Sequence, residues 1–123
     1  MVKSNANDIY FRNRVLTATP AELVLLLYDG FIKFGNMSVK FIKDKDYENA
    51  NKYILKMEAI IDELSGTLDR SYEVSKYFDN IYSYVSRRLI EANINKDNEI
   101  LEECISHIRS LRETWTEVMK IAR

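Results

Sequence analysis

The sequence predicts an all-α fold, an antiparallel up-down four-helix bundle that is preceded by a short N-terminal cap segment. Only three glycines and one proline occur among the 123 residues, so few positions favour the turns of β-hairpins. Apolar residues recur at spacings of three and four along four long segments, which is the period of an amphipathic helix. The polar links between these segments are too short for crossovers, so consecutive helices should run antiparallel.

The first bundle helix is predicted over residues 20–43. Thr19 can cap the backbone amides, Pro20 suits the first helical position, and Glu22 can reach back to the Thr19 amide, which makes a capping box. We expect one apolar row to face the core: Leu23, Leu27, Gly30, Phe34, Met37 and Phe41. A second row lies nearly opposite: Leu25, Tyr28, Ile32 and Val39. Because an ordinary surface helix has a single apolar stripe, this helix is either central or carries a docking surface.

Three further helices are predicted over residues 47–68, 72–93 and 98–122, the first and last of them capped by Asp46 and Asp97. Each has one apolar row for the core. The rows are Tyr47, Ala50, Ile54, Met57, Ile61, Leu64 and Leu68; Val74, Phe78, Ile81, Val85, Leu89 and Ala92; and Leu101, Cys104, Ile108, Leu111, Trp115, Val118 and Ala122. The chain is therefore expected to consist of an arm over residues 1–18 and a bundle over residues 19–123.

The arm carries more apolar side chains than an isolated tail needs, including Ile9, Tyr10, Val15 and Leu16. They can pack back over one end of the bundle, because such residues favour burial. Alternatively, the arm is a detachable cap over a groove that a partner later occupies.

Composition excludes several functions. With 18 basic and 19 acidic residues the net charge is −1, so we expect neither nucleic-acid binding nor stable membrane insertion. One cysteine excludes an intramolecular disulfide, and there is no signal peptide or long uncharged apolar run. These features indicate a cytoplasmic protein.

Catalytic chemistry is not expected, and no metal or cofactor site is predicted. His107, the only histidine, lies opposite the Leu101 row and should face solvent, while Cys104 lies on the core side as a small hydrophobe. A di-iron site would need two histidines. The remaining enzyme-linked alternative is a histidine-phosphotransfer bundle that uses His107, although the lysine and glycine usual near such a histidine are missing.

Aromatic residues indicate a binding surface more strongly, since eight tyrosines, five phenylalanines and one tryptophan are many for a small bundle. Two rows with a spacing of seven can remain exposed: Tyr53 with Ile60, and Tyr77 with Tyr84. With Leu25, Tyr28 and Ile32 they form the predicted groove, which suits an amphipathic segment of another chain. If the rows instead meet a second copy, the chain is a self-dimerising module; the sequence leaves monomer and homodimer open.

Three motifs resemble those of the flagellar secretion chaperones (FliS family). The first comprises Tyr10, Val15, Thr17, Ala18, Pro20, Glu22, Leu23, Tyr28 and Gly30; the second comprises Tyr82, Tyr84, Arg87, Arg88, Leu89, Ala92 and Asn93; the third comprises Leu111, Arg112 and Trp115. They occur in the family's order and spacing over nearly the whole chain. The departures are Thr19 where serine is frequent and Leu26 where methionine is common.

The resemblance implies a cytosolic export chaperone that is not an enzyme. Such a protein binds the disordered C-terminal region of flagellin, prevents premature polymerisation, and delivers the subunit to the gate of the flagellar type III export apparatus. It also implies that Tyr10 belongs to a movable cap. Arg88, at the core margin, is expected to pair with an acidic neighbour and set helix register.

Overall fold

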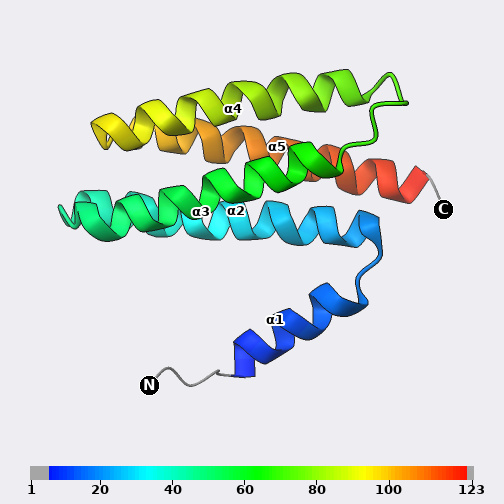
Figure 1. Cartoon of the computed structure of the whole chain (residues 1–123), viewed down its shortest axis with the longest axis horizontal. Coiled ribbons are helices and arrows are strands. Elements are labelled where there is room, and N and C mark those ends of the chain that lie inside the picture. The colour runs from blue at the N-terminus through cyan, green and yellow to red at the C-terminus, as the bar shows by residue number, and fades with distance from the viewer. Residues whose placement is uncertain (1–5, 122–123) are drawn as a thin grey trace.

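The computed structural model describes residues 6–121 and is entirely helical over that range, apart from its turns (Figure 1). It contains five helices: α1 (Ala6–Thr17), α2 (Pro20–Lys43), α3 (Tyr47–Thr67), α4 (Ser75–Asn95) and α5 (Asn98–Ile121). None of the helices in the described part is long and apolar enough to cross a membrane.

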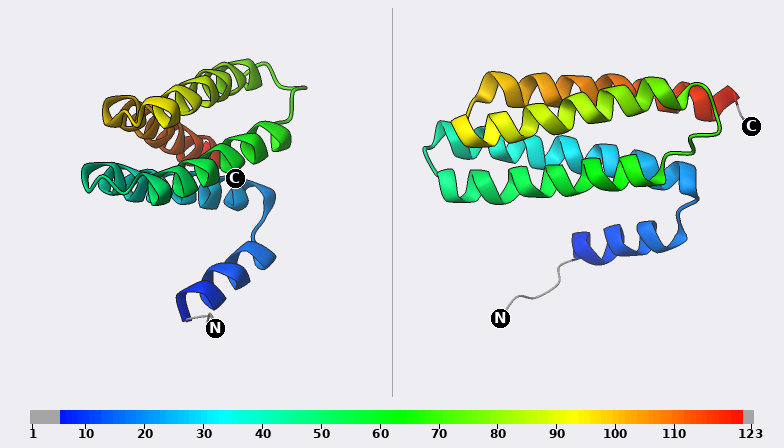
Figure 2. Two further views of the ribbon diagram at one scale, coloured as in Figure 1. Left: turned by 60° about the vertical axis from the view of Figure 1, so that its left-hand side comes forward. Right: turned by 45° about the horizontal axis from the view of Figure 1, so that its top comes forward.

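Helices α2 to α5 form the predicted antiparallel bundle. Each helix packs against two neighbours, in a closed ring of α2 with α3, α3 with α4, α4 with α5, and α5 with α2. Figure 2 shows the four axes running back and forth along the same direction. The all-helical bundle predicted from the sequence is therefore confirmed.

Local sequence signals determine where most bundle helices begin and end. In the α2 capping box, the Glu22 amide donates to Thr19 Oγ1 at 3.2 Å and the Thr19 amide donates to Glu22 Oε1 at 3.4 Å. Asp46 accepts from the Asn49 amide at 3.2 Å, and Asp97 accepts from the Glu99 amide at 2.9 Å. These bonds satisfy amides that would otherwise lack intrahelical partners.

The start of α4 differs from the prediction, because the helix begins at Ser75 rather than near residue 72. Asp69 accepts hydrogen bonds from both the amide and the hydroxyl of Ser71, at 3.0 and 2.6 Å, which holds the chain in a turn. Val74 precedes the helix and is 56% exposed, so its assignment to the core was wrong. At the other end α4 continues to Asn95, and Lys96 terminates it with a left-handed backbone, φ 51°.

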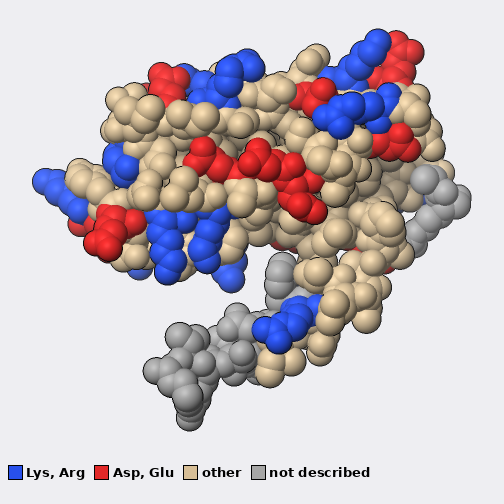
Figure 3. All heavy atoms as spheres, viewed as in Figure 1, with Lys and Arg blue, Asp and Glu red and all other residues tan. Residues whose placement is uncertain are grey.

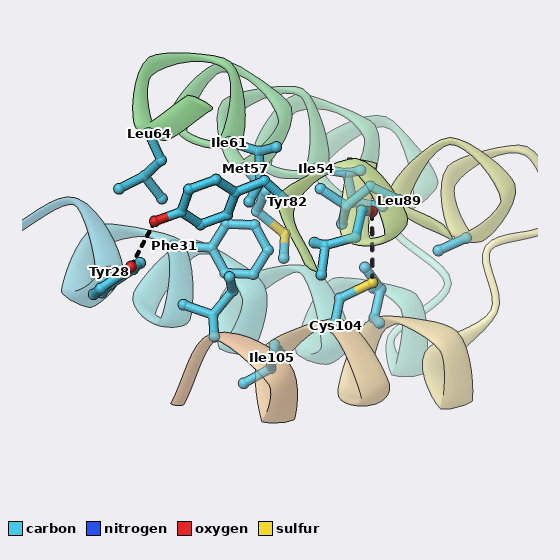
Figure 4. Packing of buried hydrophobic residues seen from close by; sticks show 14 of the residues in the cluster. Tyr28, Phe31, Ile54, Met57, Ile61, Leu64, Tyr82, Leu89, Cys104 and Ile105 are labelled. Carbon is cyan, nitrogen blue, oxygen red and sulfur yellow. Dashed lines mark hydrogen bonds between the residues drawn. The ribbon is translucent and has the colours of Figure 1, made fainter. Parts of the chain in front are cut away.

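The core contains the predicted central residues of α3, α4 and α5, and Figure 4 shows several of them meeting between the helices. Their outermost members were assigned wrongly: Tyr47 is 49% exposed and Val118 is 39% exposed, because both lie near the ends of the bundle where no opposing helix covers them. Leu68, Ile81 and Trp115 are only partly buried. Ala122 lies outside the described residues.

The core row predicted for α2 was wrong. The residues that α2 buries most completely are Leu26, Tyr28, Phe31, Gly35, Ser38 and Val39, whereas Leu23, Leu27, Gly30, Phe34, Met37 and Phe41 are only partly buried. The reason is that α2 packs against both α3 and α5, so these residues form a stripe that is directed between the two helices, except Leu26, which is buried outside the core cluster. Gly35 belongs to this stripe because an added Cβ would lie 2.7 Å from Ile105 Cγ1.

Helix α1 leaves the bundle at Ala18 and Thr19 and slants away from α2 (Figure 1). It packs closely against none of the four bundle helices. Its side chains Ile9, Tyr10 and Leu16 are 50, 64 and 75% exposed, while Val15 is partly buried. The expectation that the arm packs back over one end of the bundle is therefore not met in this structure.

Candidate binding surface

An apolar pocket of about 520 Å³ opens at the end of the bundle where α2 and α4 begin and α3 ends. We call it the end pocket. Its apolar and aromatic lining comprises Leu23, Val24, Leu27, Leu64, Leu68, Tyr72, Val74, Phe78, Tyr82 and Trp115. Ser75, Thr67 and Asp69 add a few polar groups. A concave surface of this kind, apolar with few polar groups, is typical of a binding site.

The pocket exists because the four helices do not fill their common end with side chains. Trp115 of α5 reaches across to α2, where its Nε1 donates to the Ala21 carbonyl at 3.0 Å, and its ring meets Phe78 edge to face at 5.9 Å. The link after α3 contributes Tyr72 and Val74, which are 65 and 56% exposed at the pocket. An apolar surface therefore continues from the pocket to solvent.

Two tyrosine hydroxyls meet at the inner end of this pocket (Figure 4). The hydroxyl oxygens of Tyr28 and Tyr82 are 2.6 Å apart, and the side chains are 0 and 3% exposed. Burial, and then the neighbouring Tyr82 hydroxyl, raise the pKa of Tyr28; burial likewise raises the pKa of Tyr82. Both groups therefore stay neutral at physiological pH and act as a hydrogen-bonded pair within an apolar core.

The residues predicted for a single groove lie in several places. Tyr53 and Ile60 lie on the boundary of α2 and α3, where Ile60 approaches Gly30, and Tyr77 is 51% exposed beside Phe78 near the end pocket. Leu25 and Ile32 are partly buried against the core. The predicted set therefore does not form one continuous surface.

Tyr28 requires a correction. It was expected on the outward face of its helix, but it is fully buried, because it points into the core, where its hydroxyl meets that of Tyr82 of α4. Val24, which was not singled out, and Trp115, which was assigned to the core, are only partly buried and line the pocket. Phe78 also lines the pocket but is 2% exposed, so its assignment to the core holds. Helical periodicity identifies the inward direction of each residue but does not show that the bundle is open at one end.

Tyr84 belongs to a polar cluster between α4 and α5. Glu103 accepts from the Tyr84 hydroxyl at 2.6 Å and from Arg88 Nε at 3.1 Å, and Arg88 also pairs with Glu91. The hydrogen bond from Tyr84 lowers the pKa of Glu103, and the bond from Arg88 acts in the same direction. The expected pairing of Arg88 with an acidic neighbour is thus confirmed, and it joins two helices.

The two residues considered for chemistry are His107 and Cys104. His107 is 40% exposed and meets the Tyr84 ring edge to face, with Nε2 3.5 Å from Glu103 Oε2. Cys104 is fully buried, and burial raises the pKa of its thiol to about 12. Among the described residues, no group of three or more histidine, cysteine, aspartate or glutamate side chains is placed to hold a metal ion.

The chain matches a known protein family over nearly its whole length. Residues 2–122 match the family model described as flagellar protein FliS. The chain is 37% identical over 123 residues to the flagellar secretion chaperone FliS of Bacillus subtilis, covering all of this chain and 92% of that protein. It is 28% identical over 120 residues to the Campylobacter jejuni protein of the same name, covering 96% of this chain and 94% of that protein. The chain therefore belongs to the FliS family of flagellar secretion chaperones.

Proposed function

We propose that this protein binds the disordered C-terminal region of flagellin in the cytoplasm, prevents its premature polymerisation, and delivers it to the flagellar type III export apparatus. The observation that carries the proposal is the open, apolar end pocket. A disordered client can place apolar side chains there and gain enough from their burial to offset an ordering cost of about 2–5 kcal/mol. No catalysis is required.

The half-buried boundary of α2 and α3 extends the apolar surface away from the pocket. Leu23 and Leu27 line the pocket and also belong to the partly buried row of α2 that includes Gly30 and Phe34. A long client segment that follows this row would contact Tyr53 and Ile60 as well. Contacts to Leu25 and Ile32 would require rearrangement, because these side chains already pack against the core.

We further propose that residues 1–18 act as a movable cap, separate from the bundle domain of residues 19–123. Helix α1 is joined to the pocket by a two-residue link, since Thr17 ends α1 and Pro20 lines the pocket. Its exposed Ile9, Tyr10 and Leu16, with Val15, are apolar groups that the pocket could bury. The cap and the client would then compete for one surface.

The test is isothermal titration of the full chain with the C-terminal segment of flagellin from the same organism. Saturable one-to-one binding with a negative heat-capacity change is expected, because apolar surface is buried. Deleting residues 1–18 should tighten binding, and a flagellin truncated at its C-terminus should not bind. Absence of binding by the folded full chain and by the deletion variant would overturn the flagellin assignment.

A pair of matched variants locates the site. Tyr72→Ser with Val74→Ser changes two exposed pocket residues and should weaken flagellin binding without altering the fold. Tyr47→Ser with Ile94→Ser removes two similarly exposed side chains, 49 and 77%, away from the pocket and should bind normally. His107→Gln should also bind normally, whereas a phosphotransfer domain would lose its activity.

A further inference from the structure

Three half-buried aromatic rings lie together on the boundary of α2 and α3, distant along the bundle from the end pocket. The Tyr53 ring stacks on Phe41 with centroids 5.6 Å apart and an interplanar angle of 15°, and it lies 5.7 Å from Phe34 in a tilted arrangement. All three are partly exposed. We call this surface, with the lysines described next, the aromatic–lysine face.

Lysine ammonium groups border these rings. Lys56 Nζ lies 5.2 Å from the Phe34 centroid and 5.3 Å from that of Tyr53, and Lys52 Nζ lies 5.7 Å from Tyr53. A cation over a ring is attracted by the ring quadrupole, but its N–H donors remain free for an anion. The rings therefore hold two positive charges in place without neutralising them.

Two more lysines, Lys33 and Lys40, lie on α2, each directly before a ring residue in the sequence. Each therefore points about 100° away from Phe34 or Phe41, toward the side of α2 that carries Asp29, so among the described residues Lys52 and Lys56 alone border the rings. Both are exposed. Within residues 6–121, none of the salt bridges includes Lys33, Lys40, Lys52 or Lys56.

Two acidic side chains of α3, Glu58 and Asp62, lie on the other side of that helix, whereas Glu63, seven residues after Lys56, lies on the lysine side. Glu58 and Asp62 are one turn apart and close enough that Asp62, after burial, raises the pKa of Glu58. Figure 3 shows acidic side chains along the middle of the molecule and basic ones gathered below them, toward the turn between α2 and α3. In a chain with a net charge of −1, Lys52 and Lys56 thus make the surface beside the rings locally positive.

We propose that the aromatic–lysine face binds an amphipathic helix of another protein, with apolar side chains on the Phe34, Phe41 and Tyr53 rings and glutamate or aspartate facing the lysines. Charge complementarity selects this occupant. Helix α1 fits less well, because its residues 6–17 contain two arginines and one aspartate. A second copy in a symmetric dimer would place lysines against lysines. The inference does not rest on occupation of the end pocket, but a client that follows the α2 row as far as Tyr53 would compete with this helix.

The probe is a synthetic 18-residue helical peptide with leucine and phenylalanine at i, i+3, i+4 and i+7 and glutamate on the flanking positions. Its matched control has lysine in place of every glutamate. Both are titrated against the full chain at low and high salt, and backbone amide shifts are mapped by NMR. The acidic peptide should bind one to one, shift Phe34, Tyr53 and Lys56, and weaken as salt rises.

Charge variants complete the test. Lys52→Gln with Lys56→Gln should weaken the acidic peptide about threefold to tenfold, since exposed charge pairs each contribute modestly. Lys76→Gln with Lys120→Gln removes two exposed lysines elsewhere and should have no effect. Circular dichroism confirms that each variant is folded.

Several results would overturn the proposal: equal binding of the lysine peptide, unchanged binding by the Lys52/Lys56 variant, or shifts confined to the end pocket. Binding only after deletion of residues 1–17 would assign the face to α1. Concentration-dependent dimerisation that the Lys52/Lys56 variant strengthens would assign it to a second copy.

Discussion

The hydroxyls of Tyr28 and Tyr82 form one hydrogen bond between two side chains that are otherwise surrounded by the core. The two environments are not equivalent. Tyr82 lines the end pocket and is 3% exposed, whereas Tyr28 is 0% exposed and does not line it. Removing the Tyr28 hydroxyl and removing the Tyr82 hydroxyl should therefore have different costs, because the hydroxyl that remains is in a different environment in each case.

We expect Tyr82→Phe to lower the free energy of unfolding by about 1–3 kcal/mol, because it leaves a buried hydroxyl unpaired. Tyr28→Phe should cost less, since Tyr82, which then keeps the unpaired hydroxyl, lines the pocket and Tyr28 does not. The double Phe variant should cost less than the sum, which urea denaturation in a double-mutant cycle will measure. Additive effects would show that the two hydroxyls are energetically independent.

Two glycine-to-alanine substitutions compare the cost of steric overlap in the core with the gain from reducing the backbone freedom of the unfolded chain. At Gly35 an added Cβ would lie 2.7 and 2.8 Å from Ile105 atoms and 3.0 Å from Met57 Cε, so Gly35→Ala should lower the free energy of unfolding by about 1–3 kcal/mol. At Gly66 nothing lies within 4 Å, so Gly66→Ala should stabilise α3 by up to about 0.5–1 kcal/mol. Thermal denaturation should show a lower melting temperature for Gly35→Ala and a higher one for Gly66→Ala. A stabilising Gly35→Ala would mean that Ile105 repacks without cost.

At the scale of helices, carboxylates connect or separate neighbouring elements. Glu103 of α5 accepts hydrogen bonds from Tyr84 and Arg88 of α4. In contrast, burial and the nearby Asp62 disfavour the charged form of Glu58 of α3. The pKa of Glu103 is lowered and that of Glu58 is raised. Their contributions to stability should therefore depend on pH with opposite signs.

Glu103→Gln should lower the free energy of unfolding at pH 7 by about 0.5–1 kcal/mol, a modest loss because the side chains are partly exposed. A lowered pKa in the folded state contributes stability above the unfolded value of 4.5, and this is lost as pH falls through the folded value. The difference from the parent protein should disappear in acid. A difference that persists there would point to packing rather than charge.

Glu58→Gln is the contrasting variant. Because the folded pKa is raised, ionisation of Glu58 reduces stability as pH rises from the unfolded value of 4.5 through the folded value. Removing the charge should stabilise the protein at pH 7 by about 0.2–0.5 kcal/mol, the size of a like-charge pair one turn apart. Below the unfolded pKa the gain should vanish. Urea titrations at pH 3.5 and 7 will test both variants.

The whole molecule combines a closed bundle with one helix outside it. Helices α2 to α5 each pack against two neighbours, and the core consists of residues that all four supply. Helix α1 is joined to them by a short link and packs closely against none of them (Figure 1). Stability should therefore reside in the bundle, and α1 should open independently of it.

Deleting residues 1–17 should change the free energy of unfolding of the bundle by no more than about 0.5 kcal/mol, as expected for changes away from a core. Hydrogen exchange in the full chain should be fast in α1 and slow in the centres of α2 to α5. Replacing Leu89 with Ala, at a fully buried position, should cost about 2–5 kcal/mol and provides the control. A comparable loss on deletion would show that α1 covers the bundle in solution.

The sequence by itself determined the fold class, the helix start at the Thr19 capping box, the buried centres of α3, α4 and α5, and the family, because these depend on local caps, on periodicity and on motif order. Tertiary structure decided which face of α2 is buried and that the bundle is open at one end. Both features arise from how four helices meet. An apolar residue such as Tyr28 or Phe34 satisfies the same helical period whether a neighbouring helix covers it or leaves it half exposed.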